Sequence, residues 1–301
     1  MNLKDLLYFN HIAHTLSFTA TANHFYVSQP SISMAIKRLE NELDTVLIDR
    51  KRIHKKLSLT ETGDILYHYS HQILKSVEQA EEEIHDFKHQ IVYFGFLPTI
   101  GGHFMSQLLP HLDKFSHSMK FIEEESSDKM LELVRNGKVP IAIIGSDEPT
   151  FDDDSLIQIP LKQEDMALWV SKSNPLATKK KVSPTECKED VFISLEKGYM
   201  HHRIFDDWVN DHHLKNIQTI YTKEIQTALS IASSTNMLAF LSDILVREHS
   251  GLTKVELEHP PQIYISLIVN KKIHKANAFQ TEFNQTIIDL ANTFGKAFVV
   301  E

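Results

Sequence analysis

Hydrophobic spacing near the N-terminus predicts a bundle of three short helices. In the first helix, apolar side chains recur every three or four positions: Leu3, Leu6, Phe9, Ile12 and Leu16. A shorter second helix turns Ala22 and Phe25 inward, and Tyr26 and Val27 form the turn after it. The third helix buries a similar stripe: Ile32, Ile36, Leu39 and Leu43. This periodicity is typical of amphipathic helices that share one core.

The helix starts carry recognisable capping residues. Ser28 is a good N-cap for the third helix, and Pro30 is tolerated because it lies in the first turn. Ser17 and Thr19 are available to cap the second helix. The outer face of the third helix is left with the residues that the core does not use: Ser31, Ser33, Met34, Lys37 and Arg38.

A basic segment follows the third helix. Residues 50–56 read Arg-Lys-Arg-Ile-His-Lys-Lys, and short apolar runs at 47–48 and 57–59 flank them. Two short strands joined by a charged tip would form a wing. Residues 1–59 are therefore predicted to be an all-α helix-turn-helix unit with a wing, which places its third helix in the DNA major groove.

Residues 60–90 predict one long helix that reaches about residue 88. Its apolar positions are separated by steps of three and four residues: Leu66, Tyr69, Ile73, Val77, Ala80, Ile84 and Phe87. This spacing is that of a coiled-coil seam. A lone helix with this apolar stripe and an acidic outer face needs a partner to cover the stripe, and we predict a dimerisation linker.

From residue 91 the pattern becomes apolar runs that alternate with predicted helices. The helices are expected at about 102–116, 126–136, 203–213, 223–234 and 275–294. This alternation indicates α/β architecture. The segment 91–301 is long for one simple sheet, so two lobes are predicted. Their expected limits are about 91–161 with 269–301 for the first lobe, and about 162–268 for the second.

Composition narrows the class of protein. The chain has 301 residues, 42% of them hydrophobic, and one cysteine. No stretch of 18 apolar residues and no signal-peptide pattern occurs, so we expect no membrane span and a cytoplasmic location. The net charge is −9, yet residues 1–63 carry +2. Attraction to phosphate acts over roughly 10 Å in physiological salt, so a basic head on an acidic body suits DNA binding.

The assembled motifs resemble the LysR-type transcriptional regulators over essentially the whole chain. The strongest part of the match comprises Phe18–Ala22, Val27–Ser33, Ile36–Glu40, Leu47, Arg50 and Leu59–Gly63. A weaker part comprises Leu97–Thr99, Leu109–Pro110, Asn136–Lys138, Ile141–Ile143 and Val170–Leu176. Several positions depart from the family pattern. Met34 stands where a basic residue is common, Asp44 where a glycine is usual, residues 235–237 where a glycine-rich turn is expected, and Ser242 replaces a frequent proline.

This resemblance implies a function. It implies two lobes like those of periplasmic binding proteins, with a cleft for a small inducer and no other cofactor. It also implies a homodimer or a tetramer built as a dimer of dimers, bound to double-stranded operator DNA. We expect an activator that contacts RNA polymerase.

The residues of the first 60 positions offer specific contacts to DNA. Gln29 can pair bidentately with adenine, Pro30 can touch a thymine methyl, and Thr19 at a helix start can hold a phosphate. The candidate DNA-binding residues are Thr19, Gln29, Pro30, Ser31, Ser33, Met34, Lys37, Arg38, Arg52, Lys55 and Lys56. The alternative is a solvated basic face on a winged helix that binds protein.

Effector contacts are expected where helices start at the carboxyl edge of the sheets. Thr99 is predicted to close the first strand, before a helix near Gly102, and Arg203 offers a fork for a carboxylate. The candidates are Thr99, Ile100, Gly101, Ser126, Ser127, Ser146, Tyr199, Met200, His202 and Arg203. They predict a small anionic carboxylate as ligand. In the alternative interpretation the serines are N-caps and Arg203 is a surface ion pair.

Two other classes of protein agree less well with the sequence. A periplasmic-type solute-binding protein without DNA function would share the lobes, but the missing signal peptide argues against it. An enzyme would need a nucleophile with its base or a metal cage, and neither a G-x-S-x-G elbow nor ligand spacing occurs. The pairs His201–His202 and His212–His213 lack an H-E-x-x-H frame, so no metal is predicted.

Overall fold

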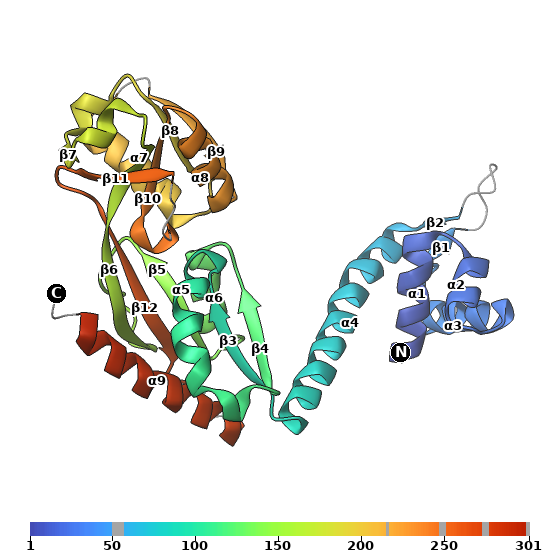
Figure 1. Cartoon of the computed structure of the whole chain (residues 1–301). Coiled ribbons are helices and arrows are strands. Elements are labelled where there is room, and N and C mark those ends of the chain that lie inside the picture. The colour runs from blue at the N-terminus through green and yellow to red at the C-terminus, as the bar shows by residue number, and fades with distance from the viewer. Residues whose placement is uncertain (50–56, 215–216, 247–250, 273–276, 299–301) are drawn as a thin grey trace. The chain divides into compact units, whose positions relative to one another are not determined.

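The computed structural model describes residues 1–49, 57–214, 217–246, 251–272 and 277–298. The chain divides into two compact units, Met1–Lys88 and His89–Glu301 (Figure 1). Each unit has its own cluster of buried hydrophobic side chains. None of the described helices combines the length and the hydropathy that crossing a bilayer requires.

The first unit begins with the three predicted helices: α1 (Leu3–Thr15), α2 (Phe18–His24) and α3 (Gln29–Glu42). The expected core is confirmed, since six side chains are at most 2% exposed: Leu6, Phe9, Ile12, Ile32, Ile36 and Leu39. The caps are confirmed as well. The Ser17 hydroxyl accepts from the amide of Ala20, and the Ser28 hydroxyl accepts from that of Ser31.

The ends of the predicted stripes are wrong. Leu3, Leu16 and Leu43 are 45%, 47% and 43% exposed. Leu16 follows α1 in a left-handed conformation with φ of 50°, and Leu43 is the C-cap of α3. Leu3 is the first residue of α1. A residue at either end of a helix no longer keeps the helical face, so periodicity overextends there.

The strands at the base of the wing confirm the predicted hairpin. β1 (Ile48–Asp49) pairs antiparallel with β2 (Ser58–Leu59), and residues 50–56 between them lie outside the described residues. The long helix α4 (Glu61–Lys88) starts directly after them. Gly63 is required here, because a Cβ at that position would stand 2.1 Å from the carbonyl oxygen of Leu47.

The second unit consists of two α/β lobes, and we call the first of them lobe I. Its sheet contains, in spatial order, β4 (Met119–Glu123), β3 (Val92–Phe96), β5 (Ile141–Ser146), β12 (Gln262–Asn270) and the start of β6 (Leu156–Ser171). Strands β3, β4 and β5 are parallel, whereas β12 runs antiparallel to β5 and β6. Its helices are α5 (Pro98–Leu108), α6 (Ser127–Arg135) and α9 (Ala278–Phe298), with 3₁₀ turns at Leu109–His111 and Asp113–Phe115.

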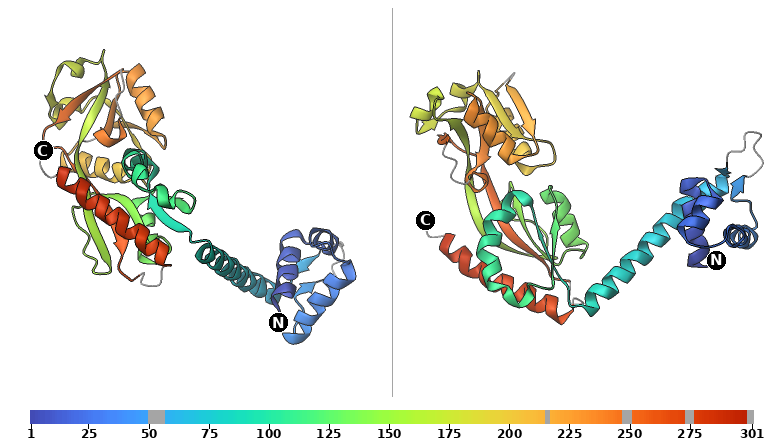
Figure 2. Two further views of the ribbon diagram at one scale, coloured as in Figure 1. Left: turned by 60° about the horizontal axis from the view of Figure 1, so that its bottom comes forward. Right: turned by 45° about the vertical axis from the view of Figure 1, so that its right-hand side comes forward.

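Lobe II is built on the second part of β6. The strands that complete it are β7 (Lys181–Val182), β8 (Val191–Leu195), β9 (Gln218–Thr222), β10 (Leu238–Ser242) and β11 (Leu252–Leu257). Its helices are α7 (Met200–Asp211) and α8 (Ile225–Ser234), with 3₁₀ turns at Pro175–Thr178, Pro184–Cys187 and Asp243–Leu245. Figure 2 shows β6 running from one lobe into the other.

Two sequence predictions change at the lobe level, and one strand spans both lobes. The apolar segments 156–160 and 166–170 both belong to that strand, β6. The predicted boundary between residues 268 and 269 falls inside β12, whose pairing with β5 over Tyr264–Val269 places that whole strand in lobe I. The helix expected at 102–116 starts at Pro98 instead, because a proline is favourable in the first turn.

Candidate DNA interface and ligand cleft

Helix α3 separates a buried face from an exposed one. Ile32, Ala35, Ile36 and Leu39 have no exposed surface, whereas Met34 is 57% exposed. Gln29, Pro30 and Lys37 are also exposed, and Ser31 and Ser33 are half-buried. The Ser31 hydroxyl lies 2.8 Å from that of Ser28. The first turn of α3 therefore presents an amide side chain, a proline ring and hydroxyls to the outside.

Two further candidate DNA contacts, Thr19 and Arg38, differ in whether the side chain already has a partner within the chain. Thr19 is exposed in the first turn of α2, as a phosphate contact requires. Arg38, in contrast, has a partner inside the unit: its Nε and Nη2 donate to the carboxylate of Asp5 over 3.0 and 2.5 Å. The Asp5 side chain is 4% exposed, so Arg38 supplies the counter-charge of a buried carboxylate. Arg52, Lys55 and Lys56 lie outside the described residues.

This pairing predicts that Lys37 and Arg38 respond differently to substitution. Arg38→Ala should lower the melting temperature of the full chain, because Asp5 is left buried without its counter-charge. Lys37→Ala should leave the melt unchanged and weaken DNA binding on all sequences, since its contact would be to phosphate. Circular dichroism melts and gel shifts measure both effects. An unchanged melt for Arg38→Ala would return that residue to the DNA-contacting group.

The apolar stripe of α4 is exposed over most of its length. Tyr69, Ile73, Ile84 and Phe87 are 58%, 37%, 69% and 64% exposed. Val77 is half-buried and Ala80 is exposed. Leu66 differs, because it packs against the core of the helix-turn-helix unit together with Tyr67 and Leu74. Leu66 is thus a core residue of its own chain, and the remaining positions form the unpartnered surface, which we call the α4 stripe.

A cavity of about 480 Å³ lies between the lobes, and we call it the cleft. Lobe I lines it with Pro98, Thr99, Gly102, His103 and Glu125. Lobe II lines it with Tyr199, Lys223, Glu224, Ile225, Gln226, Ile244 and Leu245. Its volume falls in the range of small-molecule sites.

Thr99 occupies the position in the cleft that best suits an anion. It lies in the first turn of α5, where Leu97 gives no side-chain cap and Pro98 has no N–H. Within the described residues, neither the amide nor the hydroxyl of Thr99 makes a hydrogen bond. Such free groups at a helix start favour a carboxylate or phosphate oxygen.

The two residues after Thr99 do not face the cleft, and their prediction as effector contacts is wrong. Ile100 is 1% exposed in the core of lobe I. Gly101 is buried as well, and a Cβ there would stand 2.3 Å from the ring of Phe96. One turn of helix points only part of its residues to any one side, so three consecutive residues cannot share the cleft.

The remaining candidates gather around a second cavity of about 540 Å³, which we call the α7 cavity. It is lined by Ser126, Ser127, Asp128, Lys197, Gly198, Tyr199, Met200, His202, Arg203, Asp206, Asp207 and Asn210. Tyr199 lines both cavities. Ser146, the last residue of β5, lines neither, and its hydroxyl donates to the carbonyl of Glu148 over 2.5 Å.

The polar groups of the α7 cavity mostly have partners within the chain. The Arg203 guanidinium donates to Asp147 over 2.6 and 3.0 Å and to Asp128 over 3.3 Å, which ties α7 to lobe I. The predicted carboxylate fork is therefore occupied by two aspartates. His202 contacts the carbonyl of Leu195 over 3.1 Å, and the Ser126 hydroxyl caps α6. The Ser127 hydroxyl is buried and has no partner among the described residues.

Sequence reasoning missed several residues of the cleft. Glu125 directly precedes the predicted Ser126, and Lys223, Glu224 and Gln226 stand at the start of a helix that the pattern did locate. Polar residues at every predicted helix start, rather than serines and arginines alone, would have found them. His103 lies one turn into α5 and carried no signal in the sequence.

His201, in the core of lobe II, is a buried base with a clear pH consequence. Its Nε2 lies 3.2 Å from the Ser242 hydroxyl, and burial lowers its pKa to about 4. The unfolded chain takes up this proton near pH 6.5, but the folded chain does so only near pH 4. Stability should therefore fall as the pH drops from about 6.5 toward 4. Melts of wild type and His201→Asn over this range measure it, and a flatter profile is expected for the variant.

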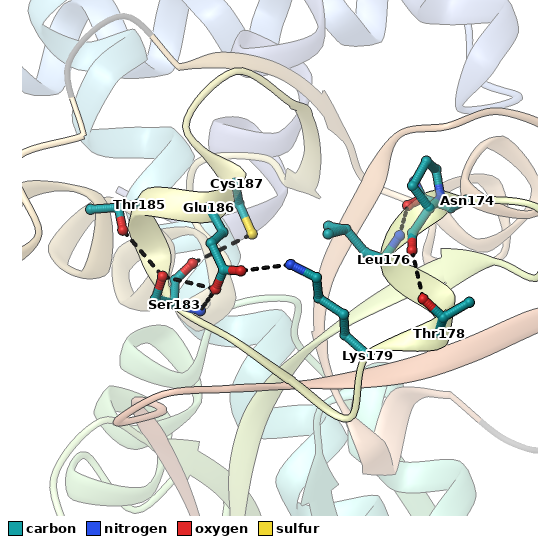
Figure 3. A network of polar contacts seen from close by, with 9 residues as sticks. Asn174, Leu176, Thr178, Lys179, Ser183, Thr185, Glu186 and Cys187 are labelled. Atoms are coloured by element: carbon teal, nitrogen blue, oxygen red, sulfur yellow. Dashed lines mark hydrogen bonds and ion pairs between the residues drawn. The ribbon is translucent and has the colours of Figure 1, made fainter.

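Cys187 is unsuited to redox chemistry. It is fully buried at the edge of lobe II, and burial raises its pKa to about 12. Its Sγ lies 3.7 Å from the carbonyl of Ser183, in a network held by the Lys179–Glu186 pair at 2.6 Å (Figure 3). Since thiolates are the reactive form, this side chain serves packing. In the described part of the chain, no group of three His, Cys, Asp or Glu side chains is placed to hold a metal ion.

A helix-turn-helix unit joined to a two-lobed α/β domain with a cleft defines a DNA-binding regulator with an effector domain. Family comparison agrees. The LysR substrate binding domain matches residues 88–285, and the bacterial regulatory helix-turn-helix protein of the lysR family matches residues 3–64. The chain belongs to the LysR family of transcriptional regulators, which are not enzymes.

Relatives span nearly the whole chain. A probable RuBisCO transcriptional regulator of Thalassiosira pseudonana is 28% identical over 94% of this chain and 96% of its own. The malolactic fermentation system transcriptional activator of Lactococcus lactis subsp. lactis (strain IL1403) is 26% identical over 97% of this chain and 99% of its own.

Solved structures share the fold. Full-length CbnR complexed with its target DNA has a TM-score of 0.63 at 16% identity, covering 96% of this chain and all of that one. The effector-binding domain of QuiR in complex with shikimate has a TM-score of 0.55 at 17% identity, covering 68% of this chain and 97% of that one.

Proposed function

We propose that this regulator binds operator DNA as a homodimer or homotetramer through α3 and the wing, and that a small metabolite bearing a carboxylate switches it from the cleft. The proposal of a ligand switch rests mainly on Thr99, which lines the cleft in the first turn of α5. Within the described residues its amide and hydroxyl make no hydrogen bond. The α4 stripe supports self-association, since a coiled-coil seam buries itself against a second copy.

The anionic character of the ligand is supported by fewer groups than the sequence predicted. Arg203 is paired with Asp147, so the anchors that remain are Thr99 and Lys223, both at helix starts lining the cleft. A carboxylate bridging these two would also touch both lobes. Ligand binding would then change the position of lobe I relative to lobe II. The Arg203–Asp147 pair also links these two lobes.

The activating sign of regulation is supported by the relative from Lactococcus lactis, which is called an activator. If the protein activates transcription, it is expected to contact RNA polymerase. A promoter fusion to a reporter gene, measured with and without the regulator, tests it: loss of expression in the deletion strain is expected, and raised expression would indicate a repressor.

Ligand binding has a direct thermal test on the full chain. A carboxylate present at 100 times its dissociation constant should raise the free energy of unfolding by about 2.7 kcal/mol. Thr99→Val and Lys223→Gln should each reduce this shift, because they remove the hydroxyl or the charge. Lys188→Gln, which lines neither cavity, is the matched control. Shifts that survive both cleft substitutions would place the ligand elsewhere.

A further inference from the structure

The charges around the cleft do not match a ligand that is only an anion. Lys223 is the one lysine or arginine among the described lining residues, and Glu125 and Glu224 bring two carboxylates. Within the described residues none of these three side chains makes a hydrogen bond or ion pair. All three are exposed to the cleft solvent, so their charges are available to a ligand.

The carboxylates of Glu125 and Glu224 both lie near the side chain of Tyr199. Its side chain is half-buried between the two cavities. Burial, reinforced by the carboxylates of Glu125 and then Glu224, raises the pKa of Tyr199. Glu125 comes from lobe I and Glu224 from lobe II, and both therefore lie close to one phenol ring. A negative ligand group at this place would meet like charge from both lobes.

We propose that the ligand of the cleft carries a carboxylate and a cationic amine together, as an α-amino acid does. This inference rests on the proposed function. The carboxylate accepts from the Thr99 amide and hydroxyl and pairs with Lys223. The ammonium pairs with Glu125 and Glu224 beside Tyr199. Each unpaired charge of the lining is then matched, and a cavity of about 480 Å³ admits a molecule of this size.

Matched probes test the two charges separately on the full chain. The panel contains the common amino acids and L-norvaline, each with its deaminated carboxylate and its decarboxylated amine; for L-norvaline these are pentanoate and butylamine. Titration calorimetry is expected to find at least one amino acid that binds, with both of its partners at least about tenfold weaker, since each lacks one charge-assisted contact. A panel in which carboxylates alone bind best, amines alone bind best, or no amino acid binds overturns the proposal.

Variants identify the groups that read the amine. The double substitution Glu125→Gln and Glu224→Gln should weaken the amino acid about tenfold or more and narrow its advantage over the matched carboxylate. Glu196→Gln is the control, because Glu196 lies near Tyr199 but lines neither cavity. Unchanged selectivity in the double variant overturns the assignment of the acids. Carboxylate binding that needs Thr99 and ignores the acids would leave the proposed function intact, whereas binding that ignores Thr99 would overturn both.

Discussion

Aspartate at Ile73 and Ile84 of α4 should convert this regulator into monomers that no longer hold their operator. Ile73 and Ile84 are 37% and 69% exposed in the isolated chain and lie in the α4 stripe. In a paired coiled coil they would become buried, and a carboxylate there has no counter-charge to meet. Because two linked half-site contacts exceed one by roughly 10²–10⁴ in affinity, we expect operator binding to fall by a similar factor.

Size-exclusion chromatography with light scattering measures the mass, and gel shifts measure the affinity. Gln79→Asp is the control, since it places one aspartate on α4 at an exposed position outside the stripe, as each of the two substitutions does within it. Its mass and affinity should remain those of the wild type. A double variant that keeps the wild-type mass would show that the chains associate through another surface.

The parts of the fold that the sequence predicted are those governed by local rules. The core of α1 and α3 follows from helical periodicity, and Ser17 and Ser28 cap their helices as side-chain chemistry dictates. The prediction that Leu16 and Leu43 are buried was wrong, because periodicity carries no signal for where a helix stops and both residues are C-caps.

The cleft could be predicted only in part, because its composition depends on contacts between distant segments. Thr99 was predicted to close a strand before a helix near Gly102, and it lies instead in the first turn of α5, where it lines the cleft. The partner of Arg203 is Asp147, 56 residues earlier, and nothing local in either segment indicates the pair. The same holds for Arg38 and Asp5, which lie on different helices. In both cases the sequence pattern assigns an arginine to a ligand or to DNA, whereas in the structure that arginine forms an ion pair with a carboxylate of the same chain.

These pairings also concentrate the recognition of DNA in fewer side chains. With Arg38 held by Asp5 and Met34 at a position where the family commonly has a basic residue, Gln29 is the long polar side chain in the first turn of α3. Lys37 is two turns further along the helix. Sequence reading should therefore depend on Gln29 more than on any cation of α3.

Gln29→Ala should weaken binding to the specific operator by ~1–3 kcal/mol, or about 5- to 150-fold, while binding to random DNA hardly changes. The side chain is exposed, and removing it leaves the Ser28 cap and the α3 core untouched, so the melting temperature should stay the same. Gel shifts on the operator and on scrambled DNA, at one fixed salt concentration, separate the two effects. Gln29→Glu is the companion variant: it keeps the length but cannot donate to adenine N7, and it should lose the same specificity. Equal losses on operator and scrambled DNA would mean that Gln29 holds the backbone, and base readout would then have to come from Pro30, Ser33 or the wing.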